Sequence, residues 1–133
     1  MSNQGVVLTT NPNLDPQEVN RVRRGHRFYP SPAQLVKVPR TYATDEIALA
    51  DKVIHLHYFG GACDWWLAEY DPENQIGFGY VCLGDPDMAE WGYVDLKELE
   101  TLIAHQGLLI IERDCHWTPR RASEANLPGR AAL

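Results

Sequence analysis

The sequence lacks any long apolar run: nothing in its 133 residues approaches the roughly 20 consecutive apolar residues of a membrane helix. The stretch from Met1 to Thr10 has neither a basic leader nor a long apolar segment, so we expect no secretory signal. Cysteine is sparse, with only Cys63, Cys82 and Cys115. An odd number of widely spaced cysteines predicts free thiols in the reducing cytoplasm rather than a disulfide framework.

Basic residues are scarce in the middle of the chain. Residues 45–114 hold three Lys or Arg against fifteen Asp or Glu, a net charge of −12. Residues 1–44 hold six against two, and residues 115–133 hold three against one, so both ends are basic. An acidic body repels phosphate, and any contact with nucleic acid would therefore come through the basic ends.

The strongest basic cluster lies near the N-terminus and consists of Arg21, Arg23, Arg24 and Arg27. It allows two interpretations: an arm that binds nucleic acid or a protein partner, or a segment that folds onto the acidic sheet of its own chain or of a second copy. The second interpretation is favoured. Charge alone cannot dock the segment, because exposed pairs contribute at most about 1 kcal/mol each. We therefore expect residues 26–38 to be ordered through apolar anchors, and residues 1–12 to be mobile. The anchors are Phe28, Tyr29 and Leu35.

Three runs rich in aromatic and β-branched residues fill positions 52–83, with turn residues between them. This pattern predicts an antiparallel meander. Strict alternation within the second run places Trp65 and Trp66 on opposite faces, so one of them points away from the main core. Either the N-terminal extension covers that outward tryptophan, or it belongs to a partner-binding patch. The same alternation puts Glu69 on the face of Trp65, and Tyr70 on the face of Trp66.

The clearest helix is predicted over residues 95–105, with Asp95 as its N-cap and an apolar stripe at helical spacing. Asp15 and Ser31, each followed by proline, predict two short helices nearer the N-terminus. Residues 108–113 predict a strand of the same sheet. The fold expected is α+β: a single antiparallel sheet, one main helix packed on it and a short N-terminal helical segment.

A series of short motifs occurs in a fixed order along the chain: Tyr42-Ala43-Thr44, Trp66 with Glu69 and Asp71-Pro72, Gly77-Phe78-Gly79, Glu90-x-Gly92-Tyr93-Val94-x-Leu96-x-Glu98-Leu99, Ile111-Glu112-Arg113-Asp114 and Trp117-x-Pro119. Together they resemble the DUF2958 family over roughly residues 32–122. The resemblance implies a small α+β domain carried by plasmids, integrative elements and phages, and it brings no catalytic residues. Residues 1–31 are then a basic, partly flexible extension, and residues 123–133 a loose C-terminal tail.

The sequence contains two candidate metal sites, and neither is favoured. His55 and His57 share a strand face, as a metal site requires, but no Cys-x-x-Cys or carboxylate–histidine spacing accompanies them. Asp87, Asp95 and Lys97 imitate a nuclease signature, in which two carboxylates bind a metal ion. Asp95 is better explained as a helix cap, so we predict no metal, no cofactor and no nuclease activity.

A thiol nucleophile at Cys115 with His116 as its base is also disfavoured, since neighbours on a strand point to opposite faces. With no convergent catalytic set, the sequence favours a non-enzymatic interaction protein of a mobile genetic element that binds a protein partner. Its candidate contact residues are Trp65, Trp66 and the four N-terminal arginines. An acidic protein that imitates DNA is the alternative, and a metal-dependent nuclease is the third hypothesis.

Overall fold

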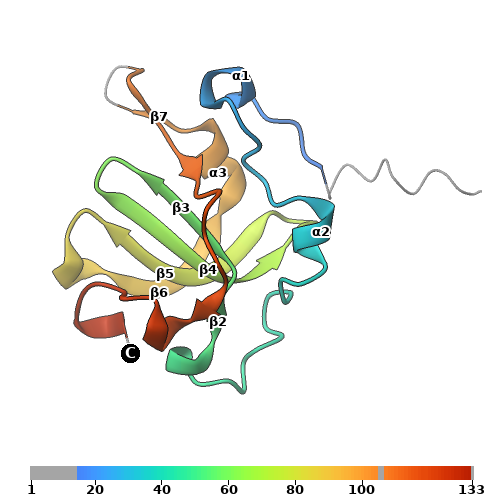
Figure 1. Ribbon diagram of the computed structural model, residues 1–133. Helices are drawn as coiled ribbons and strands as arrows, with labels where there is room; N and C mark the ends of the chain where they lie inside the picture. Colours follow the sequence, from blue (N-terminus) through green and yellow to red (C-terminus); the bar gives the residue numbers. More distant parts are fainter. Residues whose placement is uncertain (1–14, 105–106, 133) are drawn as a thin grey trace, which may run out of the picture.

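Five antiparallel strands form the main sheet of the computed structural model, which describes residues 15–104 and 107–132 (Figure 1). The strands stand in the order β6-β5-β4-β3-β9. Their bounds are Leu56–Gly60 for β3, Cys63–Asp71 for β4, Ile76–Leu83 for β5, Glu90–Asp95 for β6 and Glu112–Arg113 for β9. The fold is α+β, and the antiparallel meander predicted within residues 52–83 is confirmed.

Short strand pairs and short helices complete the fold. β2 (Val53–Ile54) pairs with β10 (Arg120–Arg121), and β7 (Ile103–Ala104) pairs with β8 (Leu109–Ile110). The helices are α1 (Arg21–Arg24), α2 (Pro32–Leu35) and α3 (Leu96–Thr101), with 3-10 turns at η2 (Leu49–Asp51), η3 (Pro86–Met88), η4 (Ala122–Glu124) and η5 (Arg130–Ala132). Within the described residues, no helix has the length and apolar content needed to cross a bilayer.

The main helix, α3, begins where the sequence predicts but ends early. The side chain of Asp95 accepts a hydrogen bond from the backbone N–H of Glu98 at 3.1 Å, which confirms the cap. The helix predicted over residues 95–105 is too long, because the chain turns at Leu102 into β7. The strand predicted over residues 108–113 is divided: β8 pairs with β7, and β9 joins the main sheet beside β3.

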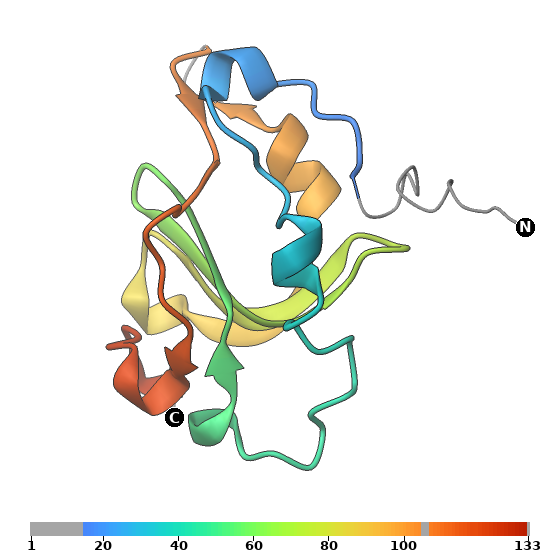
Figure 2. The ribbon, with the colours of Figure 1, turned by 45° about the vertical axis from the view of Figure 1, so that its right-hand side comes forward.

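The sheet is covered on both faces (Figure 2). Helix α3 lies on one side together with the segment that carries α1 and α2, and their apolar residues form the larger buried cluster. The C-terminal segment lies on the other side, where Ala122 and Ala132 are buried. The indole N–H of Trp91 donates to the carbonyl of Ala132 at 3.0 Å. The expectation of a loose tail is therefore wrong for residues 123–132, which close the second face of the sheet.

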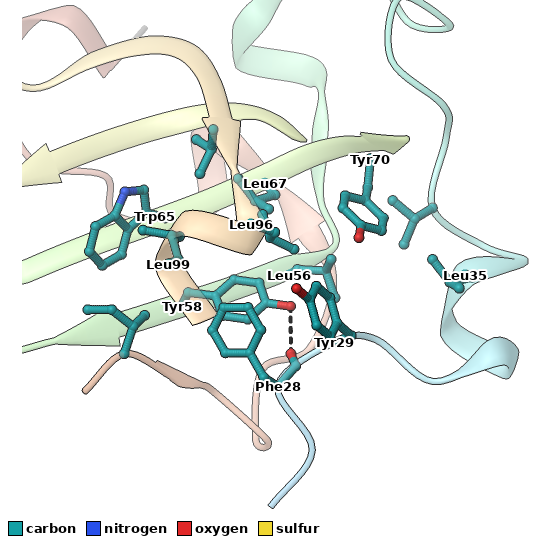
Figure 3. Packing of buried hydrophobic residues seen from close by; sticks show 13 residues of the cluster. Phe28, Tyr29, Leu35, Leu56, Tyr58, Trp65, Leu67, Tyr70, Leu96 and Leu99 are labelled. Atoms are coloured by element: carbon teal, nitrogen blue, oxygen red, sulfur yellow. Dashed lines mark hydrogen bonds between the residues drawn. The ribbon is translucent and has the colours of Figure 1, made fainter. Parts of the chain in front are cut away.

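The N-terminal segment is part of the core, as expected for residues 26–38 (Figure 3). Phe28, Tyr29 and Leu35 are all buried against the sheet, and the hydroxyl of Tyr58 donates to the carbonyl of Phe28 at 2.8 Å. The mobility expected for residues 1–12 lies outside the described residues. Burial of large aromatic rings supplies the anchoring that surface charge could not.

Only one of the two predicted N-terminal caps is confirmed. Ser31 forms a capping box with Gln34 at the start of α2. The helix predicted to start at Asp15 is wrong, because Asp15 instead lies 2.6 Å from Arg27, and α1 begins only at Arg21. Helix α1 ends at Gly25, which has φ +82°, a left-handed conformation that glycine adopts without steric cost.

A β-bulge in β4 reverses the faces of two side chains. The pairing with β5 shifts between Leu67 and Glu69, which leaves Ala68 as an extra residue. Glu69 consequently pairs with Phe78 on the side of the C-terminal segment, whereas Tyr70 joins the larger cluster. The strict alternation predicted for this strand is therefore wrong beyond the bulge.

Two buried tyrosines test this account of the core. The hydroxyl of Tyr58 has a buried partner in the Phe28 carbonyl, whereas that of Tyr70 has no hydrogen-bond partner among the described residues. Tyr58→Phe should lower the free energy of unfolding by about 1–3 kcal/mol, because it leaves the carbonyl unsatisfied. Tyr70→Phe, the matched control, should leave stability unchanged or raise it. Denaturant unfolding measures both variants, and equal losses would contradict the packing.

Candidate functional site

Arg24 is the buried centre of the predicted basic cluster. Its side chain is excluded from solvent, and Nη1 lies 2.8 Å from Oε2 of Glu100 in α3 and 3.4 Å from Oε1 of Glu18. Its Nε also donates to the carbonyl of Ile111 at 2.8 Å. A buried charge needs such pairing and hydrogen bonding, because it has lost its water.

The two carboxylates around Arg24 also bind the backbone of the N-terminal segment. Glu100 accepts hydrogen bonds from the N–H groups of Val19 and Asn20, at 2.9 Å and 3.0 Å. Glu18 accepts one from the N–H of Phe28 at 3.0 Å. The contacts of Glu100 bind the N-terminal segment to α3, and the contact of Glu18 joins two parts of that segment.

The other three arginines are less buried. Arg27 pairs with Asp15, Arg23 donates to the carbonyl of Gly107, and the more exposed Arg21 lies 4.0 Å from Oε2 of Glu18. All four arginines in the predicted cluster therefore contact their own chain, Arg24 most extensively. These contacts favour the interpretation that the basic segment folds onto its own domain.

Trp65 and Trp66 are both buried, on opposite faces of β4. Trp65 is 6% exposed in the cluster beneath α3, and Trp66 is 8% exposed beneath the C-terminal segment. Trp66 is thus the tryptophan that faces away from the main core. The expectation that the N-terminal extension or a partner covers it is wrong, because the chain's own C-terminal segment does. Neither indole offers an open face to a partner in this conformation.

His57 lies between two carboxylates. Its Nε2 is 2.8 Å from Oδ1 of Asp64, and its Nδ1 is 2.9 Å from Oδ2 of Asp114. Its ring stacks on Trp66, with the centroids 5.2 Å apart. His55 is half-buried, and burial lowers its pKa. Within the described residues, no group of three or more His, Cys, Asp or Glu side chains is placed to hold a metal ion.

The nuclease-like residues are separated by a strand. Asp87 lies in η3, before β6, and Asp95 lies at the far end of β6, where it caps α3. The strand between them spans on the order of 15 Å, too far for both carboxylates to bind one metal ion. Lys97 follows Asp95 on the exposed side of α3. The structure does not bring these three residues together.

Cys115 contacts a histidine, but not the one beside it in sequence. Its Sγ lies 3.5 Å from Nδ1 of His26, and Nε2 of His26 lies 3.2 Å from Oε1 of Glu112. No hydrogen bond among the described residues joins the thiol to the ring of His116. This cluster could not be predicted from the sequence, because 86 residues separate His26 from Glu112.

A buried ion pair borders a cavity of about 300 Å³ beside η2. Nζ of Lys52 lies 3.6 Å from Oε2 of Glu69, and both side chains are at least 95% excluded from solvent. The ammonium also donates to the carbonyl and the hydroxyl of Thr44. The ammonium is therefore both hydrogen-bonded and charge-paired inside the chain, which points to a structural role.

A second cavity, of about 330 Å³, opens beside β6. It is named here the β6 groove, and it is lined by Val81, Leu83, Asp85, Met88, Glu90, Gly92 and Tyr93. Leu83 and Met88 are 66% and 75% exposed, so apolar surface faces solvent here. Sequence analysis did not single these residues out. The one signal available was the pair of apolar residues that flanks a polar turn at residues 84–87.

Strand β6 also forms one edge of the sheet. Among the described strands it pairs with β5 alone. The N–H of Leu96 donates to the carbonyl of Gln75 at 2.9 Å, and the register then runs along β6 without a shift. Because hydrogen-bonded residues alternate in an antiparallel pair, the N–H groups of Trp91 and Tyr93 point away from β5. The groove therefore lies next to backbone donors that point away from the only described strand paired with β6.

The family comparison matches residues 32–125 to the family described as "Protein of unknown function (DUF2958)". The chain belongs to the DUF2958 family. This match confirms the resemblance predicted over roughly residues 32–122. No curated protein and no solved structure matches the chain.

The DUF2958 motifs gather at the buried ion pair. Glu69, Phe78 and Tyr93, which contribute to the resemblance, line the cavity beside Lys52. Thr44, from the first motif, hydrogen-bonds to both charges of the pair. Several motif residues of the DUF2958 domain thus hold the loop of residues 42–52 against the sheet.

The buried pair of Arg24 and Glu100 gives a stability prediction. Glu100→Ala should lower the free energy of unfolding by about 3–5 kcal/mol, because Arg24 stays buried without its main partner. The control Glu124→Ala should change stability little, since that carboxylate and its partner Arg121 are exposed. Denaturant unfolding measures both, and a small effect of Glu100→Ala would contradict the buried network.

Asp114 gives a prediction about the stability of the protein at low pH. Burial raises the pKa of Asp114, but hydrogen bonds from His57 and from the N–H of His116 outweigh burial and lower it from its usual 3.8. Because the pKa of Asp114 is lower in the folded state than in the unfolded state, its ionised form stabilises the fold at pH values above the usual pKa. That stabilisation is lost as the pH falls through the lowered pKa. Asp114→Asn should therefore lower stability at neutral pH and reduce its further loss below about pH 4. Melting temperatures across this range, with the exposed Asp87→Asn as control, measure the effect. A variant that loses stability on acidification as steeply as the wild type would contradict the assignment.

Proposed function

We propose that this DUF2958 protein is a non-enzymatic interaction protein that binds an extended segment of a protein partner in the β6 groove. The observation that carries the proposal is a strand that pairs on one side only among the described strands, beside an exposed apolar cavity. An extended peptide can add to such an edge through backbone hydrogen bonds, while alternate side chains fill the pocket. A Cβ atom added at Gly92 would meet no described atom within 4 Å. A peptide backbone could therefore approach the middle of β6 closely.

The chemistry of the groove favours a segment with alternating basic and apolar side chains. Asp85 and Glu90 line the groove, and Asp87 is exposed in the adjoining turn. Lysine or arginine would complement these carboxylates, and leucine or methionine would contact Leu83 and Met88. Nucleic acid fits this surface poorly, because phosphate would meet the same carboxylates.

The alternative of a DNA mimic has less support. Glu69 and Glu100 are buried and paired with basic side chains, and Asp64 and Asp114 bind His57. These four carboxylates bind groups of their own chain, so they are not part of a row of surface carboxylates that could imitate the phosphates of DNA. The acids of the β6 groove remain exposed and border apolar surface.

We also propose the cellular compartment in which the protein acts and the source of its partner. The three cysteines are free thiols, which suits the reducing bacterial cytoplasm. The resemblance to DUF2958 implies a mobile genetic element such as a plasmid or phage. We accordingly propose a host or element protein as the partner.

Matched variants test the groove. Random peptides displayed on phage and selected on the full chain should converge on alternating basic and apolar residues. Met88→Gln should weaken binding of a selected synthetic peptide by about 5–30-fold, because it removes an apolar contact. Val22→Gln, at a position 97% exposed in α1, should leave binding unchanged. Equal effects of the two variants would exclude the groove.

Hydrogen exchange reports on the strand edge directly. The peptide should slow exchange at the N–H groups of Trp91 and Tyr93, which point away from β5, more than at Gly92 and Val94, which already bond to it. Slow exchange at Trp91 and Tyr93 without peptide, together with a doubled mass in sedimentation, would assign the groove to a second copy. Protection confined to another strand would overturn the proposal.

A further inference from the structure

His26, Glu112 and Cys115 form a cluster where the N-terminal segment meets β9. The left-handed Gly25 ends α1, and His26 follows it immediately. Nδ1 of His26 lies 3.5 Å from Sγ of Cys115, and Nε2 lies 3.2 Å from Oε1 of Glu112. Cys115 is exposed, and the side chains of His26 and Glu112 are 28% and 42% exposed. The peptide-binding proposal leaves this cluster unused.

Two oxygen acceptors flank the His26 ring. Nε2 faces the carboxylate of Glu112, and Nδ1 also lies 3.2 Å from the carbonyl of Arg27. A proton that passes from the thiol to the ring would therefore have an acceptor beside it. Because the ring lies next to Sγ, its positive charge would then face the sulfur. The other polar neighbour of Sγ is the carbonyl of Arg113, at the longer distance of 3.7 Å.

We propose that Cys115 is a nucleophilic thiol that forms mixed disulfides with low-mass disulfides. His26 takes the thiol proton, and Glu112 is the positioning residue that holds the ring. An exposed sulfur with a histidine at hydrogen-bonding distance favours thiol–disulfide exchange, because the thiolate is the species that attacks.

The reaction balances without an external oxidant. The Cys115 thiolate attacks one sulfur of the disulfide, so a new S–S bond forms as the original S–S bond breaks. The departing thiolate takes the proton that His26 received from Cys115. The products are one mixed disulfide on the protein and one free thiol.

The other two cysteines are poor competitors. Cys82 is buried. Burial raises the pKa of Cys63, and the neighbouring Asp64 and Cys82 raise it further, which reduces its thiolate fraction. Exchange should therefore be confined to Cys115.

Iodoacetamide tests the nucleophile on the full chain, with the modification of each cysteine followed by mass spectrometry of its peptides. Cys115 should react first, and His26→Asn should slow it on the order of tenfold. His116→Asn is the matched control: it removes the sequence neighbour, whose ring does not bond to the thiol, and should leave the rate unchanged. Glu112→Gln should slow the reaction, whereas Glu112→Asp, which keeps the charge, should retain more of the rate.

Oxidised glutathione tests the chemical class. One glutathione should attach at Cys115, with the same order of rates among the variants. In a His26→Ala variant that circular dichroism finds folded, added imidazole should restore the rate. If His26 variants do not fold, the two Glu112 variants decide instead. The proposal would be overturned if His26→Asn or Glu112→Gln reacted as fast as the wild type. It would also be overturned if His116→Asn lost as much of the rate as His26→Asn, or if imidazole did not restore the rate.

Discussion

The buried contact between Arg24 and Glu100 is the constraint on which the arrangement of the chain depends. It joins residues 76 positions apart, and it fixes the N-terminal segment against α3. Phe28 can then enter the core, where its carbonyl accepts the hydroxyl of Tyr58. The same contact determines where the chain leaves α1, and so brings His26 to Cys115. Although the DUF2958 match begins at residue 32, the packed unit begins earlier.

The acidic surplus of residues 45–114 has two separate uses. Inside the domain, Glu69 and Glu100 neutralise buried Lys52 and Arg24, which a low-dielectric interior requires. At the β6 groove, carboxylates stay in water beside exposed apolar side chains. The first group stabilises the fold, and the second is available to a partner. Net charge alone does not distinguish these uses, because it ignores which carboxylates have partners.

Local sequence was enough for the elements whose causes are local. Asp95 and Ser31 were predicted as caps because a cap binds backbone only three residues away. The strands of the meander were predictable from alternating apolar residues between turns. The bulge at Ala68 was not predictable from β4 alone. It occurs where Gly79 of β5 lies very close to the backbone of β4, and that approach exists only once the two strands pair. The early end of α3 likewise depends on the pairing of β7 with β8.

The sequence by itself determined the α+β class, the meander, the main caps, the family and the charge asymmetry of the chain. The tertiary structure alone decided which charges are buried, that Trp66 lies beneath the C-terminal segment, and that β6 is the last described strand at one edge of the sheet, beside an apolar groove. It also decided that Cys115 meets His26 rather than His116. The physical reason is range: capping and periodicity act over a few residues, whereas ion pairing, edge exposure and thiol activation depend on residues that only folding brings together.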